Sequence, residues 1–95
     1  MITFAVRMRF ASEDREKVQS AVRHLAEASR REPGCVTYVP TELADNPNTV
    51  LIFEQYKDDA ALEAHRASAH FRDFAIGGLY QWMKERSVEN MNALA

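Results

Sequence analysis

The chain has 95 residues, with 12 Lys and Arg, 14 Asp and Glu, and a formal net charge of −2 at pH 7. This length suits one domain, so we expect residues 1–95 to fold as a unit. The basic residues are spread along the chain, which argues against a nucleic-acid partner. The single cysteine, Cys35, excludes an internal disulfide and a cysteine-based zinc site. No secretory signal or membrane-spanning apolar run is visible, which predicts a soluble cytoplasmic protein with no membrane partner.

The first half of the chain predicts strand, helix and strand. Residues 2–10 alternate between apolar and other side chains, as in a strand with one buried face. Ser12 is expected to cap a helix from about Glu13 to Arg31, which Pro33-Gly34 would end. Residues 35–43 predict a second strand, in which Pro40 indicates an edge position or a bulge.

The second half predicts another strand, two helical pieces and a last strand. Residues 44–48 read as a turn before a strand at 49–57, whose centre is apolar on both faces and should be buried on both. Asp58 should cap a short helix that ends near His65, and Ser68 should cap the next. Residues 86–94 form a weaker strand candidate. Apolar residues of the last helix follow α-helical spacing: Phe71, Phe74, Ala75, Gly78, Leu79 and Trp82.

The element order is therefore β-α-β-β-α-β. With short right-handed connections, this order predicts an α+β ferredoxin-like fold, in which a four-stranded antiparallel sheet has helices on one face. The third strand is apolar on both faces, so the open face of the sheet should also be covered. We expect a second copy of the chain to cover it in a two-fold homodimer.

Two histidines and one glutamate are the candidate reactive groups. His65 and His70 are five residues apart, a separation of about 140° in an unbroken helix, so they converge only if the chain bends near Ser68. Glu54 shares a strand face with apolar residues, so burial should raise its pKa and suit it to general-base work.

The same groups also have structural interpretations. Glu54 could pair with Arg7 or Arg9 on a neighbouring strand. Either histidine could simply satisfy hydrogen bonds between helix and sheet. A two-histidine, one-carboxylate iron site is disfavoured, because the spacing of these residues is not diagnostic of one.

Several stretches resemble the antibiotic biosynthesis monooxygenase (ABM) domain: residues 31–38 (REPGCVTY), 45–47 (DNP), 53–56 (FEQY), 61–65 (ALEAH) and 68–71 (SAHF). The resemblance implies a dimeric ferredoxin-like α/β barrel with a pocket between sheet and helices. It also implies oxygen attack on an aromatic polyol or hydroquinone without flavin, haem or metal. Haem-degrading members typically have a tryptophan near the position of His65 and a ligating histidine after that of His70. This chain has Asp73-Phe74-Ala75 in the later region, which disfavours haem chemistry.

Together these observations predict a cofactor-independent monooxygenase that acts on a quinol-like or polyphenolic small molecule with O2. The predicted catalytic residues are His65, His70 and Glu54, with no metal. The predicted substrate-binding residues are Tyr38, Phe53, Phe74 and Trp82.

Two other functions stay open. One is an isomerase of a small phosphorylated metabolite, which would need Arg7, Arg9 or Arg66 in the pocket. The other is a non-catalytic dimeric binding module. That module would have both histidines on backbone carbonyls and no cavity between sheet and helices.

Overall fold

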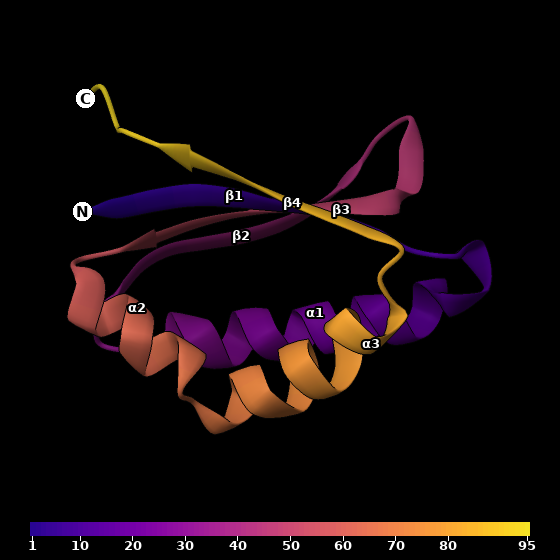
Figure 1. Ribbon diagram of the computed structural model, residues 1–95, viewed down its shortest axis with the longest axis horizontal. Coiled ribbons are helices and arrows are strands. Elements are labelled where there is room, and N and C mark those ends of the chain that lie inside the picture. The colour runs from indigo at the N-terminus through magenta and orange to yellow at the C-terminus, as the bar shows by residue number, and fades with distance from the viewer.

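The computed structural model describes residues 1–95 and contains one four-stranded antiparallel sheet, with the helices on one side of it (Figure 1). The strands lie in the order β2-β3-β1-β4, so β1 is central and pairs with both β3 and β4. This arrangement confirms the predicted ferredoxin-like β-α-β-β-α-β fold. The strand bounds are β1 Ile2–Arg9, β2 Cys35–Leu43, β3 Asn46–Tyr56 and β4 Glu85–Met91.

The helices differ from the prediction at two places. Ser12 does not cap α1 but begins a short 3₁₀ turn that leads into it, so α1 starts two residues later than expected. The last helical region is wound mainly as a π-helix rather than an α-helix. No helix has the length and apolar character needed to cross a membrane. The helical bounds are η1 Ser12–Asp14, α1 Arg15–Arg30, α2 Asp59–Arg66, η2 Phe71–Leu79 (the π-helix) and α3 Tyr80–Trp82.

The hydrophobic core lies between the sheet and the helices. Val18, Val22 and Leu25 recur at helical spacing on α1 and are buried against it. Alternate residues of β1 and β3, such as the paired Val6 and Ile52, are buried on the sheet side of the same core. Because strand side chains alternate between faces, Glu54 lies on this helix-covered face, two residues after Ile52.

The other face of the sheet has no helix over it. Leu51 and Phe53 of β3 point there and are half-buried, and Val39 of β2, which pairs with Phe53, is 43% exposed. Pro40 lies on the edge strand β2, as predicted. The β2–β3 turn is shorter than expected, so β3 begins at Asn46.

Candidate active site

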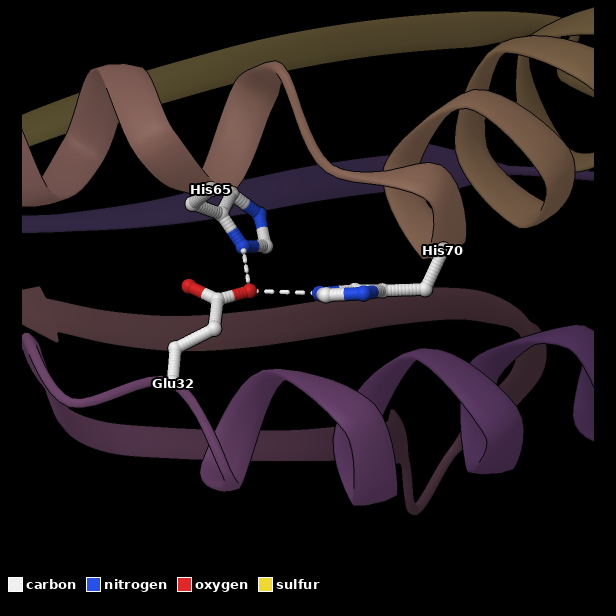
Figure 2. Close-up of side chains that lie close together, drawn as sticks. All are labelled: Glu32, His65 and His70. Carbon is white, nitrogen blue, oxygen red and sulfur yellow. Dashed lines mark hydrogen bonds and ion pairs between the residues drawn. The ribbon is translucent and has the colours of Figure 1, made fainter.

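The carboxylate of Glu32 joins the two histidines (Figure 2). Its Oε2 atom lies 2.9 Å from Nδ1 of His65 and 2.5 Å from Nε2 of His70. Only 4% of the His65 side chain and 15% of the Glu32 side chain are exposed. The histidines therefore converge, as the expected bend requires, but they meet at Glu32 rather than at Glu54.

Local capping produces the bend between the histidines. Asp58 accepts a hydrogen bond from the backbone N–H of Ala61 at 2.8 Å and starts α2, whose last turn carries His65. The Ser68 hydroxyl donates to the His65 carbonyl at 2.6 Å and accepts from the N–H of Phe71 at 3.2 Å. Ser68 thus ends one helix and begins the next, as predicted, and the second helix begins close enough to bring His70 back to the site.

Gly34 sets the distance between Glu32 and α2. A Cβ atom at Gly34 would lie 2.3 Å from the Cβ of Ala61, so only glycine lets α2 rest on this turn. The Gly34 carbonyl also accepts a hydrogen bond from the N–H of Lys57 at 3.0 Å, just before α2. The Glu-Pro-Gly stretch therefore provides the carboxylate and also the close approach that brings His65 to it.

Glu54 approaches the opposite edge of the His65 ring. Its Oε1 atom accepts a hydrogen bond from the Tyr56 hydroxyl at 2.7 Å and lies 3.7 Å from Nε2 of His65. Burial raises the pKa of Glu54 to about 7, although the hydrogen bond from Tyr56 acts in the opposite direction. This is the direction expected from the burial of Glu54 among apolar residues.

The alternative ion pairs of Glu54 do not form. Arg7 and Arg9 lie on the open face of the sheet, where they pair with Glu89 at 3.9 Å and with Glu85 at 3.1 Å.

His65 is arranged as a neutral base. Burial lowers its pKa, and the hydrogen bond to Glu32 opposes this shift. An ionised carboxylate only accepts hydrogen bonds, so the Nδ1 atom that faces Glu32 carries the ring proton. The lone pair is then on Nε2, on the side of Glu54. A histidine whose Nδ1 atom is hydrogen-bonded to a carboxylate and whose Nε2 atom is unprotonated can act as a general base.

A narrow pocket opens between the sheet and the helices beside these groups. Its volume is about 30 Å³, close to the share of one water molecule in the liquid. Its walls are mainly apolar and contain no arginine or lysine. The polar or aromatic residues that line it are Tyr38, Glu54, His65, Phe71 and Tyr80.

Tyr38 is the one predicted substrate-binding residue that lines this pocket. It is buried on β2, and its carbonyl accepts two hydrogen bonds from the Arg30 guanidinium, at 2.8 and 3.0 Å. These bonds tie the end of α1 to the strand that carries one wall of the pocket.

Three predicted substrate-binding residues do not line this pocket. Phe53 points to the open face of the sheet, because it is next to Glu54 on the same strand. Phe74 stacks on His24 of α1 with ring centroids 4.9 Å apart, and Lys17 of α1 lies over the Trp82 ring at 4.6 Å. The predicted stripe assumed α-helical spacing.

The π-helix explains the change. Its i→i+5 hydrogen bonds, as from the N–H of Tyr80 to the carbonyl of Ala75, turn each residue by a smaller angle than an α-helix does. Phe71, Ala75 and Leu79 consequently share the pocket face.

Glu32, Phe71 and Tyr80 belong to the site but were not predicted from the sequence. Glu32 lies within the REPGCVTY stretch that carries the family resemblance, so a signal was present. That signal marked the family but indicated no role for the carboxylate. Burial raises the pKa of the Cys35 thiol, which donates a hydrogen bond to the Thr37 carbonyl at 3.7 Å.

The site geometry also separates the remaining functions. Arg66 is exposed, and Arg7 and Arg9 line a different hollow on the open face. The pocket therefore lacks the cationic groups expected for a phosphorylated substrate. Both histidines are bonded to a carboxylate rather than to backbone carbonyls, which departs from the arrangement expected of a binding module.

Comparison with known proteins gives consistent matches. The profile of the family described as "Antibiotic biosynthesis monooxygenase" (ABM) matches residues 1–75. The chain is 33% identical over 78 residues to "Putative monooxygenase YcnE" of Bacillus subtilis, covering 82% of each chain. It is 39% identical over 64 residues to "Putative monooxygenase Rv0793" of Mycobacterium tuberculosis, covering 63% of this chain and 62% of that one.

A solved structure shares the whole fold. The protein described as "Putative antibiotic biosynthesis monooxygenase from Nitrosomonas europaea" superimposes with a TM-score of 0.92 at 27% identity, and the match covers 100% of both chains. The region matched by the family profile includes Glu32, Glu54, His65 and His70.

Proposed function

We propose that this chain, which belongs to the antibiotic biosynthesis monooxygenase family, is a cofactor-independent monooxygenase that oxidises a quinol-like or polyphenolic small molecule with O2. The observation that supports this most is a buried His65, oriented by Glu32, at the edge of an apolar pocket. A phenolic substrate needs a base near neutral pH and a dry, neutral cavity. The site offers His65 as the base and a narrow, mainly apolar pocket without arginine or lysine.

Proton removal begins the proposed reaction. The Nε2 atom of His65 takes the proton of a phenolic hydroxyl, and the Glu32 carboxylate, hydrogen-bonded to Nδ1, stabilises the imidazolium that forms. The hydroxyl of Tyr38, another residue that lines the pocket, donates a hydrogen bond to a substrate oxygen. The deprotonated ring is richer in electrons and passes one to O2 more readily.

Oxygen insertion then needs a controlled supply of protons. A bond forms between a ring carbon and one oxygen atom, the O–O bond breaks, and the second oxygen atom leaves as water. The substrate provides both electrons and both protons for that water, so no external reductant is required. Glu54, with a pKa raised by burial to about 7, can hold a proton from His65 and pass it to the departing oxygen.

The pocket must widen to hold an aromatic ring. Its volume of about 30 Å³ is far below the several hundred Å³ of a usual small-molecule site. Phe71 and Tyr80, at the start of the π-helix and just beyond its end, form the wall next to the helices. Displacement of these two side chains would enlarge the cavity without disturbing the sheet.

We also propose that the open face of the sheet pairs with a second copy of the chain. Leu51 and Phe53 are half-buried there and Val39 is 43% exposed, on strands that lie side by side. A two-fold dimer would bury this surface and keep the helix-covered pocket of each copy separate.

Oxygen uptake tests the proposed activity. Wild-type protein, His65→Ala and Glu32→Gln are assayed with a menadiol-type hydroquinone and an anthrone-type substrate, against the rate without enzyme. His24→Ala is the matched control, because His24 is exposed on α1 outside the site. We expect uptake by wild type and His24→Ala, and the background rate with His65→Ala. Wild-type uptake at the background rate with both substrates would reject the proposal for these classes.

A further inference from the structure

We propose that Glu32, His65 and His70 form a binding site for one first-row divalent cation of the zinc class, and that the bound ion switches off His65 as a base. The first half of this proposal concerns metal binding alone. The second half rests on the function proposed above.

The three side chains already point their ligand atoms at one place (Figure 2). One nitrogen from each histidine and one oxygen of Glu32 lie within 4.8 Å of one another. Ligand atoms of a tetrahedral zinc ion with bonds of about 2.0–2.1 Å are roughly 3.4 Å apart. The two hydrogen-bonded distances, 2.9 and 2.5 Å, would have to lengthen by about 0.5 and 0.9 Å to reach that spacing. Small rotations of the side chains supply movements of this size.

The environment of the Glu32 carboxylate favours a cation. Its Oε1 atom is buried and has no hydrogen-bond partner. A buried carboxylate oxygen without a partner is costly, and coordination to a metal is one way to satisfy it. The second oxygen of the same carboxylate therefore adds a ligand atom beyond the three that converge.

Glu54 lies next to the His65 ring nitrogen that would not bind the metal. A histidine that binds a metal usually donates its other ring N–H to a carboxylate, which fixes the tautomer. Nε2 of His65 lies 3.7 Å from Oε1 of Glu54. If Nδ1 of His65 coordinates a metal, its proton moves to Nε2, and Glu54 is placed to accept it.

Metal binding and base catalysis are then mutually exclusive. Without a metal, the tautomer in which Nδ1 of His65 donates to Glu32 leaves the lone pair on Nε2, where it can accept a substrate proton. With a metal, the lone pair of Nδ1 is used in coordination and Nε2 is protonated. The substrate would meet an N–H donor where the reaction needs an acceptor.

The donor set indicates the class of ion. Two imidazoles and one carboxylate suit Zn²⁺, Co²⁺ and neighbouring ions better than Mg²⁺ or Ca²⁺, which prefer oxygen ligands. Co²⁺ is a convenient probe, because its visible spectrum reports a low-coordinate site and it can be displaced by Zn²⁺.

Metal titration tests the site directly. Untagged, chelator-treated protein is titrated with Co²⁺ and then with Zn²⁺, and thermal unfolding is followed with and without Zn²⁺. We expect one Co²⁺ per chain, displacement by Zn²⁺ and a higher unfolding temperature with Zn²⁺. His70→Ala and Glu32→Gln should each weaken binding by more than about 10-fold, and Glu54→Gln by about 10-fold.

The controls separate this site from surface binding. His24→Ala removes the exposed histidine and should bind Co²⁺ as wild type does. Far-UV circular dichroism establishes that each variant is folded, and two ligand variants are used so that one misfolded protein does not decide the result. Equal affinity in wild type, His70→Ala and Glu32→Gln, or no Co²⁺ spectrum at all, would overturn the metal site.

Oxygen uptake with and without Zn²⁺ tests the switch. We expect saturating Zn²⁺ to abolish uptake by wild type and a chelator to restore it. Unchanged uptake by the metal-bound protein would overturn the switch. Co²⁺ binding without any quinol oxidation would refute the proposed function but support the metal site, and oxidation without metal binding would do the reverse.

Discussion

The two faces of the sheet carry similar ionisable side chains, but these are exposed to solvent on one face and buried on the other. On the open face, Arg9 and Glu85 form an ion pair of 3.1 Å with side chains 44% and 72% exposed. Such pairs are worth roughly 0–1 kcal/mol, because water solvates both charges. On the helix-covered face, Glu54 is 5% exposed and burial raises its pKa to about 7. Burial, rather than the kind of residue, is what shifts the pKa of the carboxyl group on the covered face.

Removal of the base should have the largest effect. His65→Ala should lower the rate of quinol oxidation by roughly 10²–10⁴-fold, the range typical of general base catalysis. The open face offers a matched change, Arg9→Ala, which removes an exposed ion pair and should leave the rate near that of wild type. Initial rates of oxygen uptake measure both. A loss below about 10-fold in His65→Ala would place the base elsewhere.

A charge on the open face should break the proposed dimer. Phe53→Asp removes an aromatic side chain whose burial is worth about 2 kcal/mol in each copy, and it sets two carboxylates near each other across the interface. Sedimentation velocity should show a monomer with an unchanged far-UV spectrum. Ile76→Asp is the control, since Ile76 is 46% exposed on the π-helix and away from that face. A Phe53→Asp protein that stays dimeric would contradict the proposed interface.

The buried carboxyl group should make stability depend on pH. The folded pKa of Glu54, about 7, lies above its ordinary value of 4.5. The stability from the protonated group is fully present below pH 4.5 and is lost as pH rises through 7. The loss should approach about 3 kcal/mol.

Glu54→Gln isolates that contribution. Glutamine cannot ionise, and its carbonyl can still accept the hydrogen bond from Tyr56. In urea denaturation at about pH 5 and pH 8, the stability of the variant relative to wild type should increase by about 3 kcal/mol between the two conditions. A difference that does not change with pH would show that Glu54 titrates normally.

The smallest effect is expected for the aromatic ring outside the pocket. Phe74→Leu changes a contact with His24 on α1. The KM of this variant should differ from the wild-type KM by less than about 2-fold, which corresponds to about 0.5 kcal/mol. Phe71→Leu alters the pocket wall and should change KM several-fold. Steady-state kinetics on the two variants compare the faces of the π-helix. Equal effects would mean that both faces meet the substrate.

The sequence predicted the fold well because periodicity and capping are local signals. The alternation of β1, the helical spacing of α1 and the Asp58 and Ser68 caps each appear within a few residues. Strand alternation also shows that Phe53 cannot share a face with Glu54, so that error was avoidable. Glu32 is different, because it lies in a turn without periodicity, and its partners are 33 and 38 residues away.

The π-helix limited the prediction in another way. Phe74 and Trp82 match an apolar stripe with α-helical spacing. The sequence of this segment did not predict that it would form a π-helix. Only the packing of this segment beside α1 on the covered face of the sheet shows which aromatic side chains reach the pocket.

That winding has a consequence for how the protein can change by insertion and deletion. Wide π turns arise inside α-helices and are common at functional sites. A one-residue deletion within Phe71–Leu79 would let the segment tighten toward α-helical winding, and each residue of an α-helix turns the chain by about 100°. Tyr80 would rotate out of the pocket wall while β1, β3 and their core partners kept their register. The number of residues in this one helix therefore sets the shape of the cavity wall, and it can change without a new fold.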